Sequence, residues 1–109
     1  MGLFGKESDA VKNAEDRELI EANSKAIDTL LVLAEGNADI TNELSQLQET
    51  LKYLIPSVES KVMDADKKIR NLIGDLRIAL TKSDGEESKK VGRYLSEIKL
   101  AVADRNTRL

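Results

Sequence analysis

The chain has 109 residues, enough for one domain, and its 17 basic and 20 acidic residues leave a net charge of −3 at pH 7. It contains no cysteine and no histidine, which excludes disulfides, thiolate nucleophiles, Cys/His zinc sites and histidine-dependent catalysis. We therefore expect a non-catalytic protein that uses no metal, no cofactor and no small-molecule substrate.

Helix-forming residues dominate the chain, and no stretch alternates between apolar and polar residues as a half-buried strand would. The sequence therefore predicts a single all-α domain over residues 1–109. The first helix is expected over residues 8–35, after a flexible N-terminus at residues 1–7. Gly36 stands where a glycine in the left-handed conformation commonly ends a helix.

A second helix is expected over residues 39–82, because apolar residues recur there at steps of three and four. One additional step of four separates Val58 from Val62, close to Pro56. Proline inside a helix removes one hydrogen bond and clashes with the carbonyl four residues earlier. A new helix at Pro56 would need Ile55 as its N-cap, and isoleucine caps poorly. We therefore favour one long helix with a kink near Pro56.

The third helix is expected over residues 84–107. Short turns then give an elongated antiparallel three-helix bundle or coiled coil with the kinked helix at its centre. Each end of that arrangement holds only two helices, so much of its apolar surface needs a cover, and we expect a homodimer or a higher oligomer. A compact four-helix bundle is the alternative, if Pro56 breaks the long helix.

Two polar residues interrupt the apolar seams. Asn23 lies on the seam of the first helix, and Arg105 lies on that of the last. Polar residues at such positions can fix register and copy number. Both are therefore candidates for setting the register of the bundle, unless each sits at the edge of its seam and reaches water.

The charge is divided unevenly along the chain. Residues 1–55 hold 5 basic and 11 acidic residues, a net charge of −6, and residues 56–109 hold 12 and 9, a net charge of +3. The basic half suggests an alternative function in nucleic-acid association. Acidic residues interrupt it and aromatic residues are nearly absent, so this alternative is not the favoured one. Its candidate phosphate contacts are Lys67, Lys68, Arg70, Lys89, Lys90 and Arg93.

The favoured function is a helical protein–protein interaction module, a small scaffold, adaptor, regulator or inhibitor that docks helix on helix and associates with itself. A further alternative is weak peripheral membrane contact through Leu3 and Phe4. The longest apolar run covers only residues 30–34, and the N-terminus lacks the apolar core of a signal peptide, so we expect a cytoplasmic location. The residues expected to form the interaction seam are Leu30, Leu31, Leu33, Leu44, Leu47 and Leu51.

Overall fold

The computed structural model describes the backbone of residues 2–81 and 85–107 and the side chains of residues 11–81 and 89–107. Over these residues the chain forms four helices and no strand: α1 (Gly2–Leu33), α2 (Ala38–Lys52), α3 (Ser60–Thr81) and α4 (Gly85–Thr107). The all-α prediction is confirmed. The three-helix bundle with a long helix kinked at Pro56 is wrong, because the chain leaves the helix there and the alternative of four helices holds.

The break at Pro56 follows from local chemistry. Proline lacks an N–H group and disfavours the helical conformation of the residue before it, here Ile55. Helix α2 ends at Lys52, and the Leu54 amide donates a hydrogen bond of 3.3 Å to the Leu51 carbonyl as the chain turns out of the helix. Residues 53–59 then form an extended connector between α2 and α3.

The next helix begins at Ser60, after a turn held by the Ser57 side chain. The hydroxyl of Ser57 accepts a hydrogen bond of 3.1 Å from the Glu59 amide. The Glu59 carbonyl in turn accepts from the amides of Val62 and Met63, each at 3.1 Å. A serine side chain that bonds to the backbone two residues later favours a turn over a helix. Helix α3 can therefore start at Ser60 without Ile55 as its cap.

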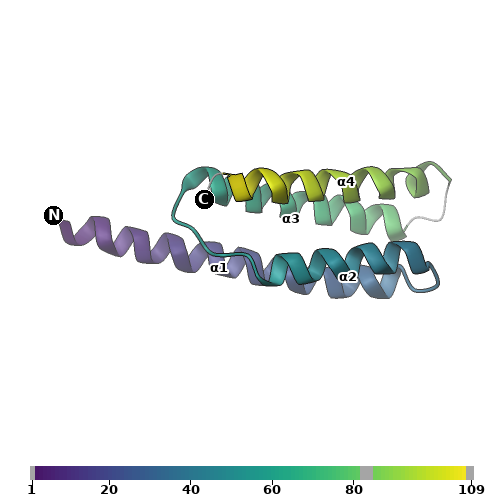
Figure 1. Cartoon of the computed structure of the whole chain (residues 1–109), viewed down its shortest axis with the longest axis horizontal. Coiled ribbons are helices and arrows are strands. Elements are labelled where there is room, and N and C mark those ends of the chain that lie inside the picture. The colour runs from purple at the N-terminus through teal and green to yellow at the C-terminus, as the bar shows by residue number, and fades with distance from the viewer. Residues whose placement is uncertain (1, 82–84, 108–109) are drawn as a thin grey trace.

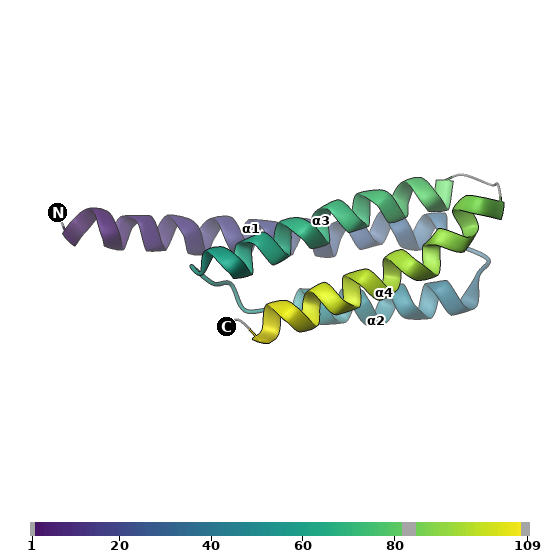
Figure 2. The ribbon, with the colours of Figure 1, turned by 90° about the horizontal axis from the view of Figure 1, so that it is seen from above.

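The four helices form two layers, and the connector crosses between opposite corners. In Figure 1, α1 and α2 lie in one layer, and α3 and α4 lie in the other. Seen from above, α1 and α3 share one side, and α2 and α4 share the other (Figure 2). Helices α2 and α3 are therefore diagonal neighbours. The connector that joins them has to pass over one end of the bundle.

The turn between α1 and α2 closes the other end. Gly36 has a φ of 96°, the left-handed conformation predicted for it. Asn37 caps α2, because its side-chain oxygen accepts a hydrogen bond of 3.2 Å from the Ile40 amide. The predicted boundary at residues 36–39 is therefore correct within about two residues.

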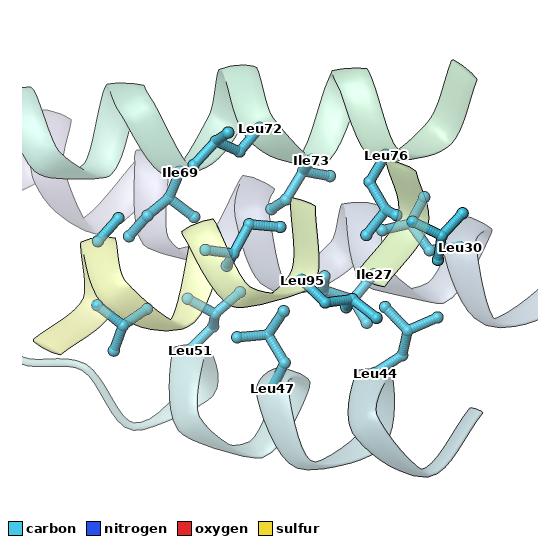
Figure 3. Close-up of a cluster of buried hydrophobic side chains, with 14 of the residues drawn as sticks. Ile27, Leu30, Leu44, Leu47, Leu51, Ile69, Leu72, Ile73, Leu76 and Leu95 are labelled. Carbon is cyan, nitrogen blue, oxygen red and sulfur yellow. The ribbon is translucent and has the colours of Figure 1, made fainter. Parts of the chain in front are cut away.

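All four helices contribute to one apolar core. Ile27 and Leu30 of α1, Leu44 of α2 and Leu76 of α3 are fully buried. Figure 3 shows these side chains converging with Leu95 of α4 between the two layers. The apolar stripes that the sequence analysis left uncovered are therefore covered by helices of the same chain. The core also includes Leu47, Leu51, Ile69, Leu72, Ile73, Ala79, Val91, Ile98, Ala101 and Val102.

Helix α1 runs well past the rest of the bundle. It begins at Gly2, whereas the sequence predicted a helix from residue 8 after a flexible segment. In Figure 1 its N-terminal turns have no other helix beside them. They extend beyond the end over which the connector passes, and they contribute to the long axis of 56 Å, against 20 and 19 Å across.

Candidate functional site

A cluster of charged side chains is buried at the connector end of the bundle. Asp16 of α1, Asp66 of α3 and Arg105 of α4 each expose 0% of their side-chain surface. The Arg105 Nε atom donates to Asp66 Oδ1 at 2.7 Å, and its Nη2 atom donates to Asp16 Oδ2 at 3.2 Å. One guanidinium therefore joins three helices away from water, where such charge-assisted bonds are strongest.

The same cluster holds the connector. Arg105 Nη2 donates to the Ile55 carbonyl at 2.6 Å, and the Ser57 amide donates to Asp16 Oδ2 at 2.7 Å. Two backbone groups on either side of Pro56 are thus bound to side chains of α4 and α1. Because the connector has no secondary structure of its own, these bonds satisfy backbone groups that a helix would otherwise pair.

A fourth polar side chain completes the cluster. Asn23 of α1 is buried, and its Nδ2 atom donates to the backbone carbonyl of Asp66 at 3.1 Å. That carbonyl lies within α3, so the bond fixes the axial position of α1 against α3. Asn23 thus makes the kind of contact that a register-setting residue needs.

The electrostatics of the cluster are unbalanced. Burial, and after it a hydrogen bond with the Asp16 carboxyl, raise the pKa of Asp66 from 3.8 to about 7, while Arg105 acts in the opposite direction. The effects that raise the pKa outweigh that of Arg105, because a desolvated carboxylate is costly and one guanidinium is shared between two carboxyl groups. Asp66 therefore holds a proton at pH values where an exposed aspartate has lost it.

Two of the four side chains in this cluster were predicted from the sequence as polar seam residues, and the other two were not. Asn23 and Arg105 were the register candidates, and the structure places both in the cluster. Asp16 was missed although it continues the seam of α1, since Leu30, Ile27, Asn23, Ile20 and Asp16 follow at steps of three and four. Asp66 was missed because the seam of the expected second helix was defined by apolar residues alone. Asp66 lies four residues after Val62 and three before Ile69, which was the available signal.

The leucines predicted to form an interaction seam lie in the interior of the chain. Leu30, Leu44, Leu47 and Leu51 are buried in the core. Leu31 and Leu33 are partly buried and pack against it.

The six basic candidates do not gather into one patch. Lys67 and Arg70 line a groove of about 350 Å³ between α1 and α3 together with Glu15 and Glu18. Lys68 lines a separate groove between α3 and α4. Lys89, Lys90 and Arg93 lie near the start of α4, beside the end of α3 and away from the other three. Arg93 is also paired with Glu97 at 3.4 Å.

Exposed apolar side chains concentrate at the connector end. Tyr53 and Ile55 expose 72% and 66% of their surface. They line a groove of about 430 Å³ with Leu54, two residues of α2 and Asn106 of α4. Among the described residues, the other large exposed apolar side chains are scattered over the helices: Val11, Val32, Ile78 and Leu100.

Leu3 and Phe4, the candidates for membrane contact, have side chains outside the described residues. In the part of the chain that the structure describes, no helix combines the length and apolar character needed to cross a bilayer. That part also contains no group of three or more acidic side chains placed to hold a metal ion. No family model, curated protein or solved structure matches the chain.

Proposed function

We propose that the chain is a non-catalytic helical protein–protein interaction module and that it binds a second copy of itself through the connector end. One observation carries the proposal: the unaccompanied turns of α1 and the exposed Tyr53 and Ile55 lie at the same end of the molecule. This end offers both helical turns without a neighbouring helix and a groove lined in part by apolar side chains.

The N-terminal turns of α1 favour a partner on physical grounds. Helices shorter than about 12–15 residues are only marginally stable in water when they pack against nothing. The segment from Gly2 to Glu15 precedes the first side chain that the cluster holds, and it has a comparable length. Within it, Val11 is 54% exposed, and Ala14 is exposed as well. A neighbouring helix or groove would stabilise this segment by covering its apolar side chains.

The groove beside Tyr53 and Ile55 suits an apolar helix face. Its lining combines the aromatic ring of Tyr53 with the aliphatic Leu54 and Ile55, between Glu49 and Asn106 at its margins. Tyrosine and large apolar residues supply much of the binding energy at protein interfaces, and polar margins are typical of them.

A second copy is the occupant that both features favour. In a twofold arrangement, the protruding turns of each copy lie on the groove of the other, so each interface is formed twice. The protruding turns are close to neutral, since residues 2–15 hold two basic and three acidic residues. They can therefore approach the groove, whose one charged lining residue is Glu49, with little repulsion.

Light scattering on a sizing column tests the proposal over a hundredfold range of concentration. The wild-type chain is expected to show a mass near twice 12.0 kDa that falls towards 12.0 kDa on dilution. The double variant Tyr53→Ser/Ile55→Ser should dissociate at a concentration at least about tenfold higher, because it loses two apolar contacts per interface.

A matched control tests whether the effect is specific to the connector end or arises at any exposed apolar side chain. Leu100 of α4 is 69% exposed and lies outside the groove, so Leu100→Ser should leave the dissociation constant unchanged. A mass of 12.0 kDa at every concentration would contradict self-association. An equal effect of Leu100→Ser would contradict the location of the interface.

A further inference from the structure

The buried cluster has more hydrogen-bond acceptors than donors. Among the described residues, its unpaired buried atoms are three oxygens, Asp16 Oδ1, Asn23 Oδ1 and Asp66 Oδ2, and one nitrogen, Arg105 Nη1. A buried polar atom without a partner costs free energy, and native proteins leave few of them. A bound proton would add a donor of the kind that these oxygens lack.

The two aspartates offer the place for that hydrogen. Each has one oxygen already bound, Asp66 Oδ1 to Arg105 and Asp16 Oδ2 to Arg105 and Ser57, and each keeps the other oxygen free. The two carboxyl groups accept from neighbouring nitrogens of the same guanidinium, Nε and Nη2, so they lie side by side. A proton on one carboxyl group can therefore be shared with the other, as in other paired carboxyl groups.

The net charge of the cluster also favours one bound proton. With both aspartates ionised, the cluster carries one positive and two negative charges, a net charge of −1 without contact with water. One bound proton makes it neutral. The charged groups facing Asp66 are Asp16 from α1 and Arg105 from α4, and the connector contributes only backbone groups of Ile55 and Ser57. Lys61, Asp64, Lys68 and Asp104 line the adjacent groove between α3 and α4, and their charges cancel in pairs.

Two of the atoms that join the aspartates to Arg105 also bind the connector. Asp16 Oδ2 accepts from both Ser57 and Arg105, and Arg105 Nη2 binds the Ile55 carbonyl. Two adjacent buried carboxylates repel each other, and any movement of Asp16 away from Asp66 strains its bond to the Ser57 amide. The protonation state of the pair is thereby coupled to the position of residues 55–57.

We propose that Asp16 and Asp66 together bind one proton and that this proton keeps the connector bound to the bundle, so that loss of the proton weakens the attachment of the connector. The proton-binding site is buried and is formed by side chains of α1, α3 and α4. It does not depend on self-association, since all of its groups belong to one copy of the chain.

The sign and size of the effect follow from linkage. The closed connector binds the proton more tightly than the open one, in which Asp66 regains contact with water and titrates as an ordinary aspartate. Opening therefore becomes more favourable as the pH rises between those two titrations, by up to about tenfold per pH unit. Above the upper titration, near pH 7, opening has no further dependence on this proton.

Two NMR measurements on the wild-type chain test the two parts of the proposal. The side-chain carboxyl carbons report titration directly, and that of Asp66 should titrate well above pH 5. Hydrogen exchange at the Ser57 amide, corrected for the intrinsic pH dependence of exchange, reports the connector. Its protection should fall at least about tenfold between pH 5 and pH 7.

Asp66→Asn is the informative variant, and Asp64→Asn is its matched control. The asparagine is neutral at every pH, keeps an oxygen for Arg105 Nε and supplies an N–H group to Asp16. Protection of Ser57 in Asp66→Asn should therefore be independent of pH over this range. Asp64 is an exposed aspartate on the same helix, so Asp64→Asn should keep the wild-type pH dependence.

Titration of Asp66 below pH 5 would overturn the proton-binding site. Constant protection of Ser57 between pH 5 and pH 7 would overturn its link to the connector. The titration is made on the wild-type chain, so it stays decisive even if a variant fails to fold.

Discussion

The two ends of the bundle use the same seam positions for different chemistry. Towards the α1–α2 turn, the seams carry Ile27, Leu30, Leu44 and Leu76, which pack without directional bonds. Towards the connector, the seams of α1 and α4 carry Asp16 and Arg105 instead, and each needs a partner at a defined distance. Apolar packing supplies most of the stability of a fold, whereas buried charges cost free energy unless they are paired.

Directional bonds are needed where the chain crosses between opposite corners of the bundle. At the apolar end, a four-residue turn with Gly36 and Asn37 joins helices that are direct neighbours. At the charged end, the connector joins helices at opposite corners, and its backbone has to be paired while it crosses. Side chains of α1 and α4, the other diagonal pair, supply those bonds. The charged end is thus the one where the chain path is least determined by apolar packing.

The largest expected effect comes from removing the shared cation. Arg105→Met leaves two buried aspartates without their positive partner and frees the Ile55 carbonyl. The free energy of unfolding at pH 7, measured in urea, should fall by about 3–5 kcal/mol. Part of that loss should be recovered at pH 5, because protonation removes the uncompensated charge. A loss below about 1 kcal/mol would mean that the cluster is solvated in solution.

A similar or slightly smaller loss is expected at the apolar end, with a different pH dependence. Leu76 is fully buried, so Leu76→Ala should lower the free energy of unfolding by about 2–5 kcal/mol through lost burial and a residual cavity. Because no titrating group is involved, the loss should be equal at pH 5 and pH 7. A loss of unfolding free energy that differed between the two pH values would contradict the proposed difference between the ends.

The smallest expected effect concerns the turn at the apolar end. Asn37→Ala removes the cap of α2 and should cost about 1 kcal/mol. Hydrogen exchange at the Ile40 amide, the donor in that cap, should increase, while the protection of Ser57 stays unchanged. A simultaneous change at Ser57 would show that the two ends are coupled through the bundle.

Much of the fold could be predicted from periodicity, because apolar spacing depends on the sequence alone. The all-α class, the end of α1 before Gly36 and the buried seam of Leu44, Leu47 and Leu51 follow from it. The break at residues 53–59 did not, since Leu54 and Val58 continue the apolar spacing across Pro56. The additional four-residue step from Val58 to Val62 spans the place where α3 begins, at Ser60.

The charged cluster could be predicted only in part. Asn23 and Arg105 interrupt apolar seams, and each could be recognised from its own helix. Asp16 and Asp66 required knowing which helices are neighbours, and that depends on the connector that the periodicity concealed. An aspartate next to an apolar seam is most often exposed, so neither residue could be assigned to the interior without the positions of Arg105 and of the connector.

The most direct test of the contrast between the two ends is the free energy of urea unfolding of the wild-type chain and of Asp66→Asn at pH 5 and at pH 7.5. The raised pKa of Asp66 means that the folded state binds its proton more tightly than the unfolded chain does, so stability is lost as the pH rises towards about 7. We expect the wild-type value to fall relative to that of Asp66→Asn by up to about 1.4 kcal/mol per pH unit over that interval. A difference between the two proteins that does not change with pH would contradict the account.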